Sequence, residues 1–112
     1  MNFSKSLKYL SKAEKIIPVC SQTFSKAPTY LPKGAAPVYL ERGEGAKVWD
    51  VDGNSYIDFI LGLGPITLGY NYPKINLAIK SQLDKGIIFS LPSPLEVELS
   101  ELITEIIPSL KW

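Results

Sequence analysis

The stretch that decides the fold is Val38-Tyr39-Leu40-Glu41-Arg42-Gly43-Glu44-Gly45-Ala46-Lys47-Val48-Trp49-Asp50-Val51-Asp52-Gly53-Asn54-Ser55-Tyr56-Ile57-Asp58-Phe59-Ile60-Leu61. β-Branched and aromatic residues recur along it between glycine-containing breaks, which is typical of strands joined by tight turns. The pattern predicts strands at Val38–Arg42, Ala46–Val51 and Ser55–Leu61, with a turn at Gly43–Gly45. Asp52-Gly53 predicts a two-residue hairpin loop of type I′, in which both central residues take positive φ. We therefore expect a short antiparallel meander of three strands.

An amphipathic helix is expected before the meander, over residues 3–17, because apolar residues recur there at helical spacing. Its apolar face holds Phe3, Leu7, Leu10 and Ile17, and a second stripe holds Lys5, Lys8, Lys12 and Lys15. Pro18 ends this helix. Prolines and a glycine punctuate residues 18–37, so we expect an extended arm or ordered loop there. The helix and arm form one predicted unit, 1–37, and the remainder forms a second, 38–112.

Two further helices are expected after the meander, following a brief extended piece at Ile66–Gly69. The first begins near Pro73 and ends before Gly86, which stands where a glycine often follows a helix. The second begins with the pattern Ser93-Pro94-Leu95-Glu96, which is typical of a capping box, and ends at Pro108. Its apolar stripe consists of Leu95, Leu99, Leu102, Ile103 and Ile106.

Composition excludes several classes of function. The 112 residues are 46% hydrophobic with a formal net charge of +1, so nothing marks a nucleic-acid-binding surface. The absence of histidine excludes Ser-His and Cys-His nucleophile pairs and histidine metal sites within these residues, and Cys20 cannot form an internal disulfide. No apolar run approaches the roughly 20 residues needed to span a bilayer. We expect no metal, no membrane partner and a cytoplasmic location.

Three short motifs could carry chemistry but fit it poorly. Gly62-Leu63-Gly64 follows a predicted strand as a phosphate loop would, but Pro65 removes an N–H donor there. Residues 50–54 resemble the start of a calcium loop, but the glycine comes one place early, so a hairpin turn is the preferred interpretation. Five carboxylates in and beside the meander could include an acid–base pair, but their spacing selects no two: Glu41, Glu44, Asp50, Asp52 and Asp58. No catalytic residue is predicted.

The order of residues is more specific than their spacing. The run from Gly43 to Phe59 resembles the opening of class III pyridoxal-phosphate aminotransferases, and within them the glutamate-1-semialdehyde aminomutase-like branch. The likeness continues through Gly64-Pro65 and through Phe89-Ser90-Leu91-Pro92-Ser93-Pro94-Leu95-Glu96. It covers essentially the whole chain and is strongest from residue 38 onward.

The resemblance implies an α/β fold, the fold type I of these enzymes, of which this chain would supply the N-terminal part of the small domain. It implies amino-group transfer between small amines and carbonyl compounds by a homodimeric enzyme with pyridoxal 5′-phosphate as cofactor. In the family, the cofactor lysine and the phosphate loop lie beyond the region that this chain matches. The chain by itself is therefore predicted to be inactive, with Lys111-Trp112 leading into a large domain.

The resemblance places five residues near the pocket: Phe24, Leu63, Gly64, Ser90 and Leu91. Phe24 stands where the aminomutases carry an arginine that holds a substrate carboxylate, and Leu63 stands where they carry a tryptophan. Phenylalanine cannot clamp a carboxylate. We therefore expect a transferase acting on another carbonyl compound, such as a sugar or other polysaccharide precursor. The sequence leaves open the amino donor, the acceptor and the choice between mutase and transferase.

A second hypothesis is non-enzymatic. The chain would be a remnant or one half of a split enzyme, acting as an interaction module through the apolar faces of its meander and helices. A need for a partner that carries the cofactor lysine would favour this hypothesis.

Overall fold

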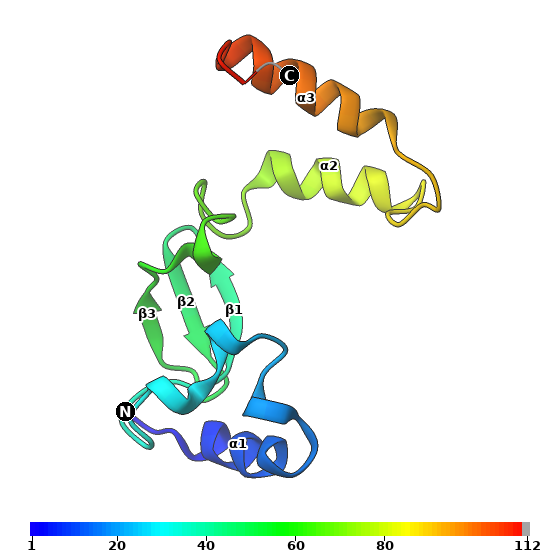
Figure 1. Ribbon diagram of the computed structural model, residues 1–112. Helices are drawn as coiled ribbons and strands as arrows, with labels where there is room; N and C mark the ends of the chain where they lie inside the picture. The colour runs from blue at the N-terminus through cyan, green and yellow to red at the C-terminus, as the bar shows by residue number, and fades with distance from the viewer. Residues whose placement is uncertain (111–112) are drawn as a thin grey trace. The chain divides into compact units, whose positions relative to one another are not determined.

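The computed structural model describes residues 1–110 and shows helix, irregular arm, meander and two helices in that order (Figure 1). The elements are α1 (Ser4–Ile16), η1 (Pro18–Cys20), η2 (Phe24–Lys26), η3 (Pro28–Tyr30), β1 (Leu40–Glu44), β2 (Lys47–Asp50), β3 (Ser55–Ile57), η4 (Leu61–Leu63), α2 (Pro73–Leu83) and α3 (Pro94–Ile106). The expected architecture is therefore confirmed. The predicted continuation at Lys111-Trp112 lies outside the described residues.

The chain forms two compact units, the first from Met1 to Ile75 and the second from Asn76 onward. The first contains α1, the arm, the sheet and η4, and the second contains most of α2 and all of α3. The boundary predicted after residue 37 stays a prediction. What was expected as an arm contains the three short 3₁₀ helices η1, η2 and η3.

The sheet has the strand order β1-β2-β3 with both pairs antiparallel. β1 and β2 are offset by an irregularity between Leu40 and Arg42, after which Arg42 pairs with Trp49. The Arg42 guanidinium lies 3.5 Å from the centroid of the Trp49 ring, a cation–π contact between paired strands. The predicted turn at Gly43–Gly45 is wrong in its position, because Gly43 and Glu44 continue β1 and only Gly45-Ala46 connect the strands.

The β2–β3 hairpin differs from the predicted two-residue loop. Its loop has three residues, Val51–Gly53, since Asp50 N–H donates to the Asn54 carbonyl and Gly53 N–H donates to the Asp50 carbonyl (both 3.0 Å). Gly53 alone among the loop residues has positive φ. This is the three-residue hairpin in which a type I turn is followed by a left-handed glycine. The longer loop forms because the Asp50 carboxylate accepts from the N–H groups of Asp52 (3.0 Å) and Asn54 (2.8 Å).

The third strand is shorter than predicted. β3 ends at Ile57, because Asp58 N–H donates to Ala46 O (2.9 Å), in the connection before β2, and the chain then turns into η4. The predicted extended piece at Ile66–Gly69 is also wrong. Those residues form turns that end at Gly69, whose N–H donates to Ile66 O (3.0 Å).

The hairpin loop holds the start of α1. No side chain of the helix itself caps it, and the Asp52 carboxylate instead accepts from the backbone N–H groups of Lys5 (2.7 Å) and Ser6 (2.9 Å). These are unpaired donors of the first helical turn, where negative charge is favourable. Asn54 adds a second tie, from its side-chain amide to the carbonyl of Asn2 (2.8 Å). A residue far along the sequence therefore does the work of an N-cap.

The buried apolar core of the first unit is small. Leu10 and Ala13 of α1 are buried, together with Ala27 in the arm and Val48 in the central strand. Tyr9 and Tyr39 pack ring to ring at 5.8 Å and join α1 to the segment that leads into the sheet. The predicted apolar face of the first helix is therefore only partly buried, since Leu7 and Ile17 remain exposed.

The helices of the second unit bear out the sequence prediction. Ser93 and Glu96 form the expected capping box, in which Glu96 Oε1 accepts from Ser93 N–H (2.9 Å) and Ser93 Oγ accepts from Leu95 N–H (3.3 Å). Gly86 has φ +94 just after the first of the two helices, as expected of a glycine at this position. Both helices have exposed apolar stripes, because none of the described residues of α2 or α3 is buried.

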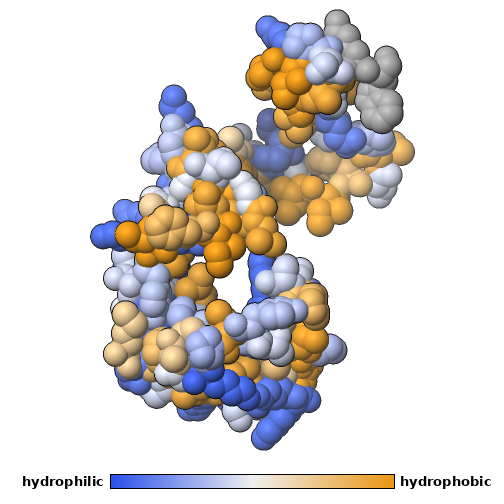
Figure 2. Space-filling model, turned by 60° about the vertical axis from the view of Figure 1, so that its left-hand side comes forward, coloured by the Kyte–Doolittle hydropathy of each residue, from blue (hydrophilic) through white to orange (hydrophobic). Residues whose placement is uncertain are grey.

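Apolar side chains are prominent on the surface, as the orange areas of Figure 2 show. Those of α3 include Leu95, Leu99, Leu102, Ile103 and Ile106. Among residues 1–110, no helix is long and apolar enough to cross a bilayer.

Acid is expected to destabilise the first unit. Desolvation opposes ionisation of Asp50 and Asp52, but the hydrogen bonds that their carboxylates accept outweigh it, so both pKa values are lowered from 3.8. A lowered folded-state pKa contributes stability that is complete above the unfolded-state value and is lost as the pH falls through the folded-state value. Denaturation followed by circular dichroism should therefore show stability falling below about pH 4.

Asp52→Asn provides the test of this assignment, since it removes the charge at the start of α1 and keeps the shape. It should lower stability at neutral pH and flatten the acid dependence. The exposed Asp84→Asn, in the second unit, is the matched control and should change neither. An unchanged acid profile in Asp52→Asn would contradict the role given to this carboxylate.

Candidate functional site

The most unusual backbone of the chain lies between the sheet and α2. Four consecutive residues have positive φ: Leu61 (+54), Gly62 (+60), Leu63 (+68) and Gly64 (+117). Two of them are leucines, for which the left-handed region costs about 1–2 kcal/mol each. Such strain persists only where the surrounding structure enforces it, and it is concentrated at functional sites. Leu63 and Gly64, two of the five predicted pocket residues, lie within this left-handed turn.

Backbone hydrogen bonds between residues 60 and 66 hold the left-handed turn. Leu63 N–H donates to Ile60 O (3.0 Å), and the N–H groups of Gly64 (3.0 Å) and Ile66 (3.1 Å) both donate to Leu61 O. The N–H groups of Leu63, Gly64 and Ile66 are therefore engaged within the turn and are not free to cradle a phosphate. This agrees with the poor fit of Gly62-Leu63-Gly64 to a nucleotide loop.

The Asp58 carboxylate spans the left-handed turn from one end to the other. Its Oδ1 accepts from Ile60 N–H (2.8 Å), just before the turn, and its Oδ2 accepts from the Tyr70 hydroxyl (2.6 Å), just after it. The hydrogen bond from Tyr70 is the largest cause of a lowered pKa at Asp58, and the same bond, aided by desolvation, raises the pKa of Tyr70 to about 12. The pair is therefore an ionised carboxylate and a neutral phenol at ordinary pH.

Tyr70 is itself fixed against the end of the sheet. Its N–H donates to Gly45 O (2.8 Å), and Gly45 N–H donates to Tyr70 O (3.0 Å), which forms an isolated antiparallel bridge. The ring lies on Gly43, where any side chain would collide with it, and Gly69 has no room for one because Gly45 O is too close. Gly43 and Gly69 therefore allow the close approach that places the phenol beside Asp58.

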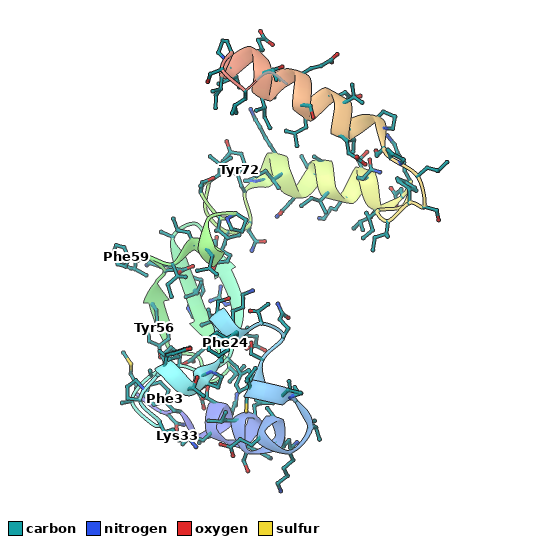
Figure 3. All side chains as sticks on the ribbon, in the orientation of Figure 1. Phe3, Phe24, Lys33, Tyr56, Phe59 and Tyr72 are labelled. Carbon is teal, nitrogen blue, oxygen red and sulfur yellow. The ribbon has the colours of Figure 1, made fainter. Side chains whose placement is uncertain are left out.

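The other predicted pocket residues are also exposed. Phe24 lies in η2, is 69% exposed and meets Tyr30 edge to face at 5.7 Å (Figure 3). Ser90 and Leu91 are adjacent and exposed in the link between α2 and α3, within the second unit. The structure thus brings Leu63 and Gly64 into one turn and Ser90 and Leu91 into one link.

The carboxylates of the hairpin have structural partners. Asp50 is 1% exposed, and besides the two N–H groups already described it accepts from the Asn54 amide (2.8 Å) and the Tyr56 hydroxyl (2.9 Å). Asp52 caps α1. Neither is therefore available as a general acid or base, and among the described residues no group of three histidine, cysteine or acidic side chains could hold a metal.

The described residues do not fit pyridoxal phosphate by themselves. The N–H groups at the start of α1 and α3 are taken by Asp52 and by the Ser93 capping box. Each lysine that the structure describes is exposed. A hollow of about 180 Å³ contains Lys5, Lys8 and Lys12 with Tyr9, but all four side chains belong to one helix and no second element walls it.

Sequence reasoning overlooked the Asp58–Tyr70 pair. It named Asp58 only as one of five unselected carboxylates and gave it no partner. The available signal was the pair of glycines at 43 and 69, which leave room for the ring and for a close backbone approach.

The family profile of the class-III aminotransferases matches residues 30–111, which include the sheet, the left-handed turn and both helices of the second unit. The chain belongs to this family. The left-handed turn and the link between α2 and α3 both lie within the matched residues, and the resemblance seen in the sequence is confirmed.

Two kinds of relative agree with this assignment. A glutamate-1-semialdehyde 2,1-aminomutase from Chloroflexus aggregans is 37% identical over 109 residues, which are 97% of this chain and 24% of that protein. The solved structure of an omega-transaminase from Sphaerobacter thermophilus matches with TM-score 0.79 and 31% identity, covering 95% of this chain and 23% of that one. A transaminase solved with PLP bound matches with TM-score 0.77 and 30% identity, covering 94% and 24%.

The chain thus spans about a quarter of the length of the relatives it matches. The fold expectation is confirmed by these likenesses, since the described elements superpose on part of known transaminases.

Gly64 should not tolerate a side chain. Its φ of +117 is a conformation that residues with a Cβ rarely adopt, although the space around it is open. Gly64→Ala is therefore expected to cost about 1–3 kcal/mol of unfolding free energy, measured by urea denaturation. The exposed Thr67→Ala, three residues on and without positive φ, is the control and should stay within about 0.5 kcal/mol of the wild type. Equal effects of the two substitutions would contradict the strain assigned to Gly64.

Proposed function

We propose that residues 1–112 are the N-terminal part of a class-III enzyme that transfers an amino group to a carbonyl compound, or moves one within a molecule, with pyridoxal 5′-phosphate as cofactor. The observation that carries the proposal is the family match over residues 30–111 together with the similarity to a transaminase solved with PLP bound. The cofactor supplies an electron sink for the carbon that bears the amino group.

The role of this chain in that enzyme is to shape part of the pocket. Leu63 and Gly64 lie in a strained, exposed turn, and Phe24, Ser90 and Leu91 are exposed and free to meet another part of the protein. The lysine that carries the cofactor and the groups that bind its phosphate would come from the remaining three quarters of a protein as long as the relatives. The complete enzyme is proposed to be a homodimer, and a cytoplasmic location stays a prediction from the sequence.

The cofactor assignment is tested by expressing the complete reading frame that contains residues 1–112 and comparing it with the 112-residue chain. The complete protein should show the visible absorbance band of bound pyridoxal phosphate and should transaminate. The 112-residue chain should show neither, because its described lysines lie on open surfaces. A borohydride-stable adduct on any lysine of the 112-residue chain would contradict its predicted inactivity.

We also propose that the substrate lacks the carboxylate that the aminomutases hold at the position of Phe24. A sugar or other polysaccharide precursor would meet this condition. Phe24 is apolar and exposed, with Tyr30 against its edge, and it has no donor for a carboxylate.

The substrate proposal predicts the effect of Phe24→Arg in the complete enzyme. A guanidinium at this position should raise kcat/KM for a carboxylate-bearing carbonyl substrate by about tenfold or more relative to a neutral one. Phe24→Leu, which is apolar and of similar length, is the control and should leave the ratio of the two substrates unchanged. A wild-type enzyme that already prefers glutamate 1-semialdehyde would contradict the proposal.

One observation favours the second candidate, an interaction module. α2 and α3 bury none of their described residues, and the stripe of α3 exposes five large apolar side chains, including Leu95 at 51% and Ile106 at 69%. Such surfaces normally lie against another part of a protein. The candidates are distinguished by comparing the 112-residue chain alone with a mixture of this chain and the separately expressed remainder. Sedimentation shows whether the two associate, and a split enzyme should regain cofactor binding only in the mixture.

A further inference from the structure

The left-handed turn, Leu61–Gly64, contains two leucines with strained backbone. Two leucines occupy a backbone region that glycine would occupy without cost. Glycines at both positions would give the same backbone path with less strain. We therefore infer that the leucines are kept for their side chains, in spite of the strain. Leu63 is the more exposed of the two, with 65% of its surface accessible.

Strain of this kind needs a clamp, and Asp58 with Tyr70 provides it. The carboxylate ties Ile60, immediately before the turn, to the Tyr70 phenol, six residues after its end. Tyr70 cannot follow a shift of the turn, because its backbone is paired with Gly45 and its ring lies on Gly43. The position of the turn relative to the sheet is therefore fixed by the hydrogen bond between the Asp58 carboxylate and the Tyr70 hydroxyl.

The clamped turn presents hydrocarbon. Phe59 is 88% exposed and points away from the sheet (Figure 3), and Ile60 and Leu68, which precede and follow the turn in sequence, are also exposed. The one charged side chain among residues 58–69, Asp58, is already bound by the two donors described above. A ligand that meets the turn at Leu63 would therefore meet an apolar side chain on a backbone with little freedom to move away.

We propose that Asp58 and Tyr70 are positioning residues that hold the left-handed turn in place, so that Leu63 contacts the hydrocarbon part of the substrate and selects for it. The inference rests on the proposed function, because it places Leu63 at the substrate pocket of an aminotransferase. It goes beyond that function in naming two residues that never touch the substrate and yet set its selection. Gly43 and Gly69 serve the same end, because Gly43 leaves room for the Tyr70 ring and Gly69 lets the backbone approach Gly45.

The experiment compares Tyr70→Phe with Tyr56→Phe in the complete enzyme. Each substitution deletes one hydroxyl that donates to an aspartate, Tyr70 to Asp58 (2.6 Å) and Tyr56 to Asp50 (2.9 Å), and each keeps the ring. Tyr56 faces the N-terminal segment and not the left-handed turn, as its contact with Met1 shows (Figure 3). The two variants therefore match in chemistry and differ in which part of the unit they loosen.

The first measurement is selectivity, the ratio of kcat/KM for two carbonyl substrates that differ by one methylene. Contact with Leu63 should give a ratio of about fourfold, the effect of one buried methylene. Tyr70→Phe should bring this ratio close to one, mainly through KM, and Tyr56→Phe should leave it unchanged. Leu63→Ala should lose the ratio in the same way, since it removes the side chain that makes the contact.

The second measurement is hydrogen exchange of the Leu63, Gly64 and Ile66 amides, which close the turn. Exchange should quicken in Tyr70→Phe and not in Tyr56→Phe. If Tyr70→Phe does not fold, Asp58→Asn replaces it, because asparagine keeps the size and one acceptor, and a partial loss of selectivity is then expected.

The outcomes are distinct. Faster exchange without any change of selectivity would make the pair merely structural and would overturn the inference, as would unchanged exchange in Tyr70→Phe. A wild-type protein without the visible band of bound cofactor would overturn the proposed function, and this inference with it, before any variant is made. Lost selectivity with faster exchange, in a variant that still binds the cofactor, is the expected result.

Discussion

The first unit depends on the carboxylate of Asp50. It is almost fully buried and accepts four hydrogen bonds, two from hairpin N–H groups and two from the side chains of Asn54 and Tyr56. A buried charge with fewer partners would cost several kcal/mol, so the hairpin that supplies those donors is strongly specified. The shape of that hairpin sets Asp52 at the start of α1, where its carboxylate holds the first turn of the helix.

A second aspartate–tyrosine pair does at the other end of the sheet what Asp50 and Tyr56 do at the hairpin. Asp58 and Tyr70 join the end of β3 to the bridge at Gly45 and hold a left-handed turn between them. In both pairs the phenol donates to an ionised carboxylate. Burial and then this hydrogen bond raise the pKa of Tyr56 to about 12, and the hydrogen bond and then burial raise the pKa of Tyr70 to about 12. The first pair attaches a helix, whereas the second supports the turn that carries two of the predicted pocket residues.

The described residues contain only part of what a class-III aminotransferase needs. The described residues do not form a pyridoxal-phosphate site by themselves, and the part that the left-handed turn takes in a substrate pocket stays a proposal. The small buried core and the exposed stripes of α2 and α3 agree with a segment that completes its packing against other protein. In the first unit, hydrogen bonds to aspartate carboxylates fix the local structure more than burial of apolar side chains does.

The sequence by itself determined the features that depend on neighbouring residues. The capping box at Ser93 and Glu96, the glycine after α2 and the three-stranded order of the meander were all predicted, because caps, glycines and alternation act within a few positions. Only the tertiary structure decided the three-residue loop at Val51–Gly53, the early end of β3 and the left-handed turn. Each of these depends on a carboxylate meeting donors that local pattern does not reveal, and Asp58 with Tyr70, twelve residues apart, is the clearest case.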